Sequence, residues 1–149
     1  MNLLPLSPVA DRLKEPGLCP SLRLVGSAAD LAAVARSKTP ANVAAFVVLL
    51  GADNVQTLEG SGPLRQVLQV TVAVVLRVTL SGAEGAAGLK QLETPAGEVR
   101  AALFGWMHPD GQLKFTISAE ALEDFDPATG VTLYRLDFTT RVRLQEPTS

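Results

Sequence analysis

The longest patterned stretch of this chain is residues 64–80, where apolar and polar positions alternate. One set of alternate positions is apolar except for Gln66, and the other mixes arginine, glutamine and threonine with small apolar residues. Because the side chains of a strand point alternately to its two faces, the pattern predicts a strand with one buried and one half-covered face. Strands usually have about 5–6 residues, so this one should bend or project past its sheet.

Residues 44–50 (AAFVVLL) form a continuous apolar run of strand length. A run without alternation indicates that both faces are covered, which is typical of a strand inside a sheet. Turn-forming residues dominate the following segment, 51–63, and include Gly51, Asp53 and Asn54. This composition predicts a mobile surface loop.

The C-terminal part predicts a β-hairpin. Its strands are residues 113–119 and 131–144, and the segment 124–130 (DFDPATG) between them is rich in turn formers. One face of the first strand carries Leu113, Phe115 and Ile117. The inward positions of the second are Tyr134, Leu136, Phe138, Val142 and Leu144, alternating with outward Arg135, Asp137, Thr139, Arg141 and Arg143.

Two short helices and a short strand are expected near the N-terminus. Ser7 would cap the first helix, with Pro8 in its first position, and a Pro-Gly pair at 16–17 would end it. Residues 22–25 predict a strand. Ser27 would cap the second helix, which covers residues 28–36.

A third helical region follows a turn predicted at 81–85. Pro95 cannot donate an intrahelical hydrogen bond and disfavours helical geometry at Thr94, so we expect a break between helical pieces at 86–93 and 95–104. The second piece should end at Gly105, before a turn at 108–111. Its apolar stripe consists of Val99, Ala102, Leu103 and Trp106.

The resulting order is α-β-α-β-β-α-β-β, without a regular βαβ rhythm. It predicts an α+β fold: a mixed, mostly antiparallel sheet of about four to five strands, with helices packed on one face and a C-terminal hairpin. The chain of 149 residues suits a single domain covering 1–149.

Composition narrows the possible partners. The net charge is −2 and the sequence pI about 5.4, which disfavours general or sequence-specific binding to nucleic acid. No apolar run is long enough to span a membrane, and the N-terminus lacks the features of a secretory signal. The single cysteine excludes an internal disulfide and favours a reducing compartment.

Candidate catalytic side chains are few. His108 is the only histidine and is more simply interpreted as a turn residue, while Cys19 has no local base and is better explained as a buried thiol. Glycines 82, 85 and 88 match neither a P-loop nor a dinucleotide fingerprint. We therefore expect no catalytic residue and no cofactor.

An acidic cluster lies at the predicted hairpin. It could in principle supply a catalytic carboxylate pair or bind Ca²⁺, but its spacing fits no calcium loop, and a solvated hairpin tip is the favoured interpretation. No metal site is expected. The cluster consists of Glu120, Glu123, Asp124 and Asp126.

The outward faces of the two longest strands are basic, which leaves two interpretations of equal weight. The arginines either protect the strands against aggregation or form a docking face for an acidic partner. In a ring, such a face could meet the Asp124 and Asp126 region of the next copy. The basic positions are Arg65, Arg77, Arg135, Arg141 and Arg143.

The order of these segments resembles the phage tail terminator family, in its Mu-like prophage form. The resemblance covers most of the chain and is carried by SLRLVGSAADLAAV, by AAFVVLL with its Gly/Asn loop, by QVLQVTVAVVLRV and by EVRAALFGWMHPDG leading into LEDFD. Its most family-like stretch is R-x-A-L-x-G-W, formed by Arg100, Ala102, Leu103, Gly105 and Trp106. Pro95 departs from the regular helix that the family leads us to expect.

The resemblance implies a structural virion protein and no enzyme. Members of this family are similar in forming a homo-hexameric ring at the head-proximal end of the tail, assembled in the host cytoplasm. The ring stops polymerisation of the tail tube protein and presents a joining surface to head-completion proteins, with the sheath as a further partner in contractile tails. The alternative is a non-catalytic adaptor or chaperone-like module in tail or head-tail assembly.

Overall fold

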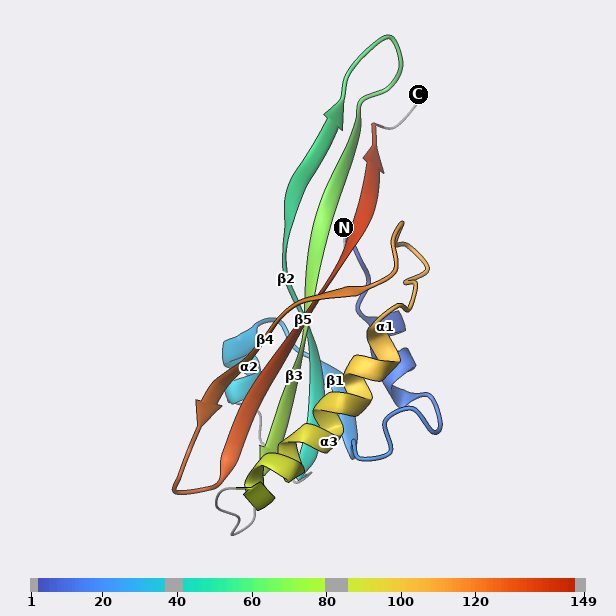
Figure 1. Cartoon of the computed structure of the whole chain (residues 1–149). Coiled ribbons are helices and arrows are strands. Elements are labelled where there is room, and N and C mark those ends of the chain that lie inside the picture. Colours follow the sequence, from blue (N-terminus) through green and yellow to red (C-terminus); the bar gives the residue numbers. More distant parts are fainter. Residues whose placement is uncertain (1–2, 37–41, 80–85, 147–149) are drawn as a thin grey trace.

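A five-stranded sheet runs the length of the molecule (Figure 1). The computed structural model describes residues 3–36, 42–79 and 86–146. The strands are β1 (Leu24–Ser27), β2 (Val43–Leu58), β3 (Arg65–Thr79), β4 (Thr116–Phe125) and β5 (Val131–Gln145), in the spatial order β1-β2-β3-β5-β4. Only β1 and β2 are parallel, and the other pairs are antiparallel. The predicted α+β class, element order and C-terminal hairpin are confirmed.

The main core lies between the sheet and two helices, α1 (Ser7–Lys14) and α3 (Ala86–Leu103). Leu13 of α1 and Val99 and Leu103 of α3 are fully buried there. Each such side chain contributes about 1.5–3 kcal/mol through burial. The predicted stripe on α3 therefore faces the sheet, and Gly105, with φ of +80°, ends the helical segment as expected.

The remaining helix, α2 (Leu31–Ala35), lies on the other face of the sheet. It connects the parallel strands β1 and β2, and its Val34 packs against Phe46 of β2 and Val75 of β3. The helices thus do not all share one face, because a crossover between parallel strands brings its helix back onto the sheet.

The central strand is β3, and it has the two faces that its sequence predicts. Val72, Val74 and Leu76 enter the main core, while Ala73 and Val75 enter the smaller core under α2. Strand β2 is interior, as its apolar run indicates, since it lies between β1 and β3.

The loop predicted at 51–63 is largely strand. β2 continues to Leu58, and Gly51, Asp53 and Asn54 pair with β3. Two register shifts interrupt this pairing, one between Leu49 and Gly51 and one between Asn54 and Gln56. Antiparallel pairing to the long β3 outweighs the local turn preference, and the bulges accommodate it.

The predicted break at Thr94 is wrong, because α3 is continuous and contains Pro95. Both Pro95 and Ala96 are buried, so packing against the rest of the molecule compensates for the hydrogen bond that proline cannot donate. The predicted turn at 81–85 lies outside the described residues.

Several predicted boundaries also shift. The residue before α1 is Leu6, which provides no side-chain cap, and α2 is capped by Asp30 rather than by Ser27. Strand β1 begins two residues later than predicted, at Leu24. Strand β4 begins at Thr116 and continues to Phe125, which leaves Leu113 half exposed outside the strand.

Candidate interaction surface

Three strands extend beyond the helical layers and form an arm (Figure 1). We define the arm as residues 51–58 of β2, 65–69 of β3 and 141–145 of β5, with the connection 59–64. Every residue from 51 to 60 is exposed. This part of the arm therefore contributes little to the core and is exposed to solvent.

The outer edges of the arm have free backbone groups. β1 pairs with β2 only as far as Val47, and β4 pairs with β5 only from Thr139 towards the hairpin tip. Within the described residues, the outer edge of β2 beyond Val47 and that of β5 beyond Arg141 have no strand partner. Such edges can accept a further strand from another chain.

The predicted basic residues lie on one face of the sheet, as the alternation requires. The β3–β5 register aligns Val67 with Arg143 and Gln69 with Arg141, so these arginines share the face of Arg65. Arg65, Arg141 and Arg143 are exposed, and their guanidinium groups form no ion pair or hydrogen bond with the described residues. The arm therefore presents three arginines without an ion-pair partner among the described residues, together with the exposed carboxylates of Asp53 and Glu59.

Two of the predicted interface arginines lie instead in the body of the sheet. Arg135 Nη1 lies 2.9 Å from Glu123 Oε1, and Arg135 Nε lies 2.9 Å from Asp137 Oδ1. Arg77 is half buried. Asp137, predicted to face solvent, is only 6% exposed, and burial raises its pKa although Arg135 opposes the shift. Arg135, Glu123 and Asp137 thus form a small charge network on the face of the smaller core, and no ion pair joins Arg77 to it among the described residues.

The acidic cluster is dispersed by the fold. Glu123 pairs with Arg135, and Glu120 turns towards α3, so neither belongs to a free acidic surface. Asp124 and Asp126 remain at the hairpin tip, where Asp124 Oδ1 accepts a hydrogen bond from the Phe125 amide and Asp126 Oδ1 one from the Ala128 amide. Only these two carboxylates remain at the tip to meet a partner.

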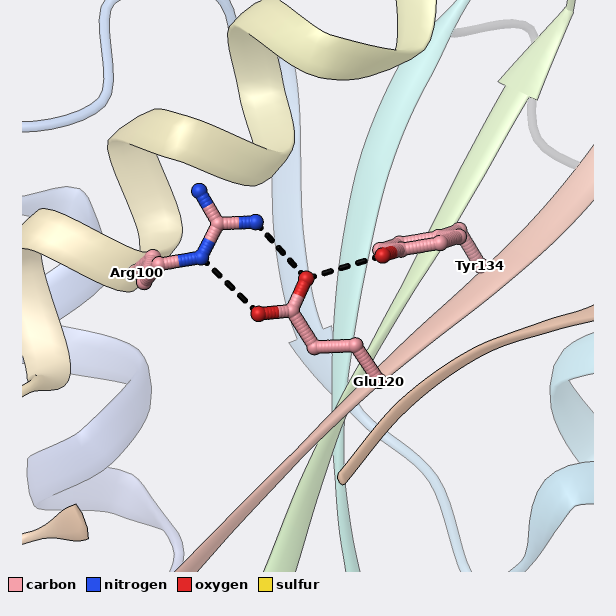
Figure 2. Close-up of polar contacts among 3 residues, drawn as sticks. All are labelled: Arg100, Glu120 and Tyr134. Carbon is pink, nitrogen blue, oxygen red and sulfur yellow. Dashed lines mark hydrogen bonds and ion pairs between the residues drawn. The ribbon is translucent and has the colours of Figure 1, made fainter. Parts of the chain in front are cut away.

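A clamp that the sequence analysis missed joins β4 and β5 to α3. Arg100 donates two hydrogen bonds to Glu120, of 2.8 and 2.7 Å, and the Tyr134 hydroxyl donates a third of 2.8 Å (Figure 2). The hydrogen bonds from Arg100 lower the pKa of Glu120, and burial followed by the Glu120 contact raises that of Tyr134. The clamp fixes the hairpin relative to the helix.

His108 is fully buried and anchors the N-terminal segment. Its Nδ1 accepts a hydrogen bond from the Asp110 amide at 2.9 Å, so Nε2 carries the proton and donates to the Pro5 carbonyl at 2.7 Å. The ring also contacts the edge of Trp106. Its role is structural, and the neighbouring family-like stretch supplies Arg100 of the clamp and Trp106 of this contact.

The other candidate groups have no catalytic environment. Burial raises the pKa of the Cys19 thiol to about 11, which disfavours the nucleophilic thiolate. Among the described residues, no three His, Cys, Asp or Glu side chains lie close enough together to ligate a metal. Within the same part of the chain, no helix has the length and apolar character needed to cross a membrane.

Known proteins that resemble this chain belong to a gene transfer agent virion and to a family of phage tail proteins. The structure resembles a chain from the virion of a native gene transfer agent particle, with a TM-score of 0.53 and 18% sequence identity over 91% of this chain and 92% of that one. Such a likeness shows a shared fold. No curated protein matches the sequence. The family described as phage tail terminator protein matches residues 1–148, and this chain, a structural protein of phage tails, belongs to that family.

Proposed function

We propose that this protein forms a homo-hexameric ring that caps the head-proximal end of the phage tail tube, ends tube polymerisation and provides the joining surface for head-completion proteins. The observation that carries the proposal is the arm, a three-stranded projection whose outer edges have no strand partner among the described residues and which presents Arg65, Arg141 and Arg143 outside any ion pair with them. Beyond its base, the arm contributes no side chain to the main core. Stabilising the fold therefore does not explain why the arm is so long and so exposed.

The physical basis of capping is competition for the growing end of the tube. A tube can grow while its last ring of subunits still exposes the surface that binds the next ring. A ring that covers that surface through its arms, and that presents a different surface outward, prevents further addition. Strand pairing along the arm edge would supply backbone hydrogen bonds, and the arginines would select an acidic partner.

The proposal gives the chain a structural rather than a catalytic role, which is supported by its membership of the tail terminator family and by the raised pKa of the Cys19 thiol, since that shift disfavours the thiolate. The partners are then further copies of itself, the tail tube protein, the head-completion proteins and, where the tail contracts, the sheath. Assembly in the host cytoplasm and incorporation into the virion follow from the same role.

The test is the length of tubes assembled from the cognate tube protein with and without this protein, measured by negative-stain electron microscopy. We expect shorter tubes that carry a distinct cap at one end. Tubes of unchanged length without caps, at saturating protein, would overturn the terminator proposal. That result would favour an adaptor that binds one partner in a one-to-one complex, which chromatography with light scattering would detect.

A further inference from the structure

A cleft of about 520 Å³ lies at the base of the arm, between β5 and the segment that leads from α3 to β4. Its apolar lining comes from Met107 and Leu113, which are 45% and 49% exposed. Lys114 and Arg141 supply positive charge at the same place. Exposed apolar side chains bordered by unpaired cations are typical of a surface that binds another protein.

The walls of this cleft are held in place by hydrogen bonds. The Gln112 amide donates to the Arg141 carbonyl at 2.8 Å, and the Thr140 hydroxyl donates to the Leu113 carbonyl at 2.6 Å. The segment also approaches β5 closely at Gly111, where a Cβ atom would lie 3.0 Å from Thr140 Oγ1. A preformed cleft loses little conformational entropy when it is filled.

The hairpin tip between β4 and β5 has the complementary character. Leu122 and Phe125 are 59% and 48% exposed. A register shift between Leu122 and Asp124 places Leu122 opposite Tyr134 and Phe125 opposite Thr132, so both apolar side chains lie on one face. Asp124 lies opposite Leu133, so its carboxylate is on the other face of the hairpin, and Asp126 follows directly after the strand on the same tip.

The tip cannot fill the cleft of its own chain. The two lie towards opposite ends of β5, and Val131 and Arg141 are separated by about 33 Å of extended strand. The hairpin tip of a second copy has the apolar and acidic character that the cleft would accept, and it is not bound by this separation. Such a contact joins two different surfaces of the same chain, and repetition of a contact of this kind closes into a ring when the rotation allows it.

We propose that the hairpin tip of one copy inserts into the arm-base cleft of the next, with Phe125 against Met107 and Leu113, and with Asp126 at the end of the tip facing Lys114 and Arg141. This inference rests on the proposed ring, and it names the contact that builds it. It also gives the exposed bulge of β4 a function, since the bulge aligns the two apolar side chains.

Disulfide cross-linking between two single variants tests the contact. We would mix Met107→Cys protein with Phe125→Cys protein in the presence of assembling tubes, oxidise the mixture and analyse it on denaturing gels. A covalent dimer should form in the mixture and be at least tenfold weaker with either variant alone. The native Cys19 is buried and should not compete. The matched control pairs Phe125→Cys with Phe104→Cys, which is 60% exposed and lies outside the cleft.

The outcomes separate this contact from the proposed function. Capped, shortened tubes without the specific cross-link would overturn the contact and leave the terminator role in place. A specific cross-link without any effect on tube length would support the contact and overturn the terminator role. A cross-link equally strong in the Phe104→Cys control would show random collision and would also overturn the contact.

Discussion

At the scale of single residues, His108 shows how a lone histidine can be essential to the fold without any part in catalysis. It joins segments that are distant in the sequence, since its partners are the Pro5 carbonyl and the Asp110 amide. The ring is also among the largest fully buried side chains of the described residues. Losing it should therefore remove packing and leave polar backbone groups unpaired.

We predict that His108→Ala lowers the free energy of unfolding by about 2–4 kcal/mol, because a cavity forms and two buried hydrogen bonds are lost. His108→Phe keeps much of the packing against Trp106, so it should lose less than the alanine variant but remain below the natural protein. Urea unfolding followed by circular dichroism measures both. A cost below about 0.5 kcal/mol for His108→Ala would contradict the anchoring role.

The clamp of Arg100, Glu120 and Tyr134 should make stability depend on pH. Arg100 lowers the pKa of Glu120 in the folded state, so the folded protein holds this proton less tightly than the unfolded chain. The stabilisation is complete above the unfolded pKa of about 4.3 and is lost as pH falls through the lower folded pKa.

We predict that Glu120→Gln is destabilising near neutral pH, by about 1 kcal/mol, and that the difference from the natural protein shrinks at pH values below about 4. Urea unfolding at a series of pH values would show it. The matched control is Glu93→Gln, an exposed carboxylate on α3, the helix that carries Arg100. A difference between Glu120→Gln and the natural protein that stays constant down to pH 2 would argue against the charged clamp.

At the scale of elements, the arm and the body have different roles. Residues 51–58 are exposed on a strand whose first half is buried, so one continuous element serves both the core and the outer surface. The bulges within β2 increase its twist and bend the arm relative to the body. We therefore expect changes in the first half of β2 to affect the stability of the fold, and changes in residues 51–58 to affect binding to other molecules.

We predict that shortening the arm leaves the fold stable and abolishes capping. Replacing residues 54–68 with Asn-Gly would join Asp53 and Gln69, which are register partners, by a two-residue hairpin turn. The melting temperature should fall by less than about 8 °C, because few buried contacts are removed. Tube length in electron micrographs should return to that of tubes assembled alone. Normal capping by the shortened protein would show that the arm is dispensable.

At the scale of the whole molecule, charge is separated along β5. The free arginines lie on the arm, and the tip carboxylates lie at the other end of the hairpin. Because the arm also carries Asp53 and Glu59, the separation is between the unpaired arginines and the tip carboxylates rather than between a basic and an acidic end of the molecule. The arginines of one copy then attract the tip carboxylates of the next, and salt should weaken the attraction.

We predict that Arg141→Glu with Arg143→Glu abolishes ring formation and binding to tube ends. The control is Arg23→Glu with Lys90→Glu, which changes the formal charge equally at exposed positions of the body. Binding of the natural protein, measured by co-sedimentation with tubes, should also weaken between 50 and 500 mM salt, on the order of tenfold. Unchanged binding of the arginine variant would remove the arm arginines from the interface.

Features that depend on contacts between residues close in the sequence could be predicted from it, and features that depend on contacts between distant segments could not. The apolar face of β3, the stripe on α3 and the end of the helical segment at Gly105 depend on neighbours within a few residues, and they were predicted correctly. The length of β2 was not predicted correctly, because pairing with β3 outweighs the turn preference of the residues that follow Leu50. The predicted interface arginines could not be sorted by sequence, since only the pairing of β4 with β5 brings Glu123 to Arg135 and so removes this arginine from the free surface.

The sequence by itself determined the α+β class, the long alternating strands, the common face of the arginines and the resemblance to the tail terminator family, because alternation and segment order are properties of the chain. Only the tertiary structure decided where β2 ends, that Pro95 lies inside a continuous helix and that His108 is an anchor. It also decided which charges are left free on the arm and the tip. These outcomes depend on pairing and packing between distant segments, whose energies exceed the local preferences of a few residues.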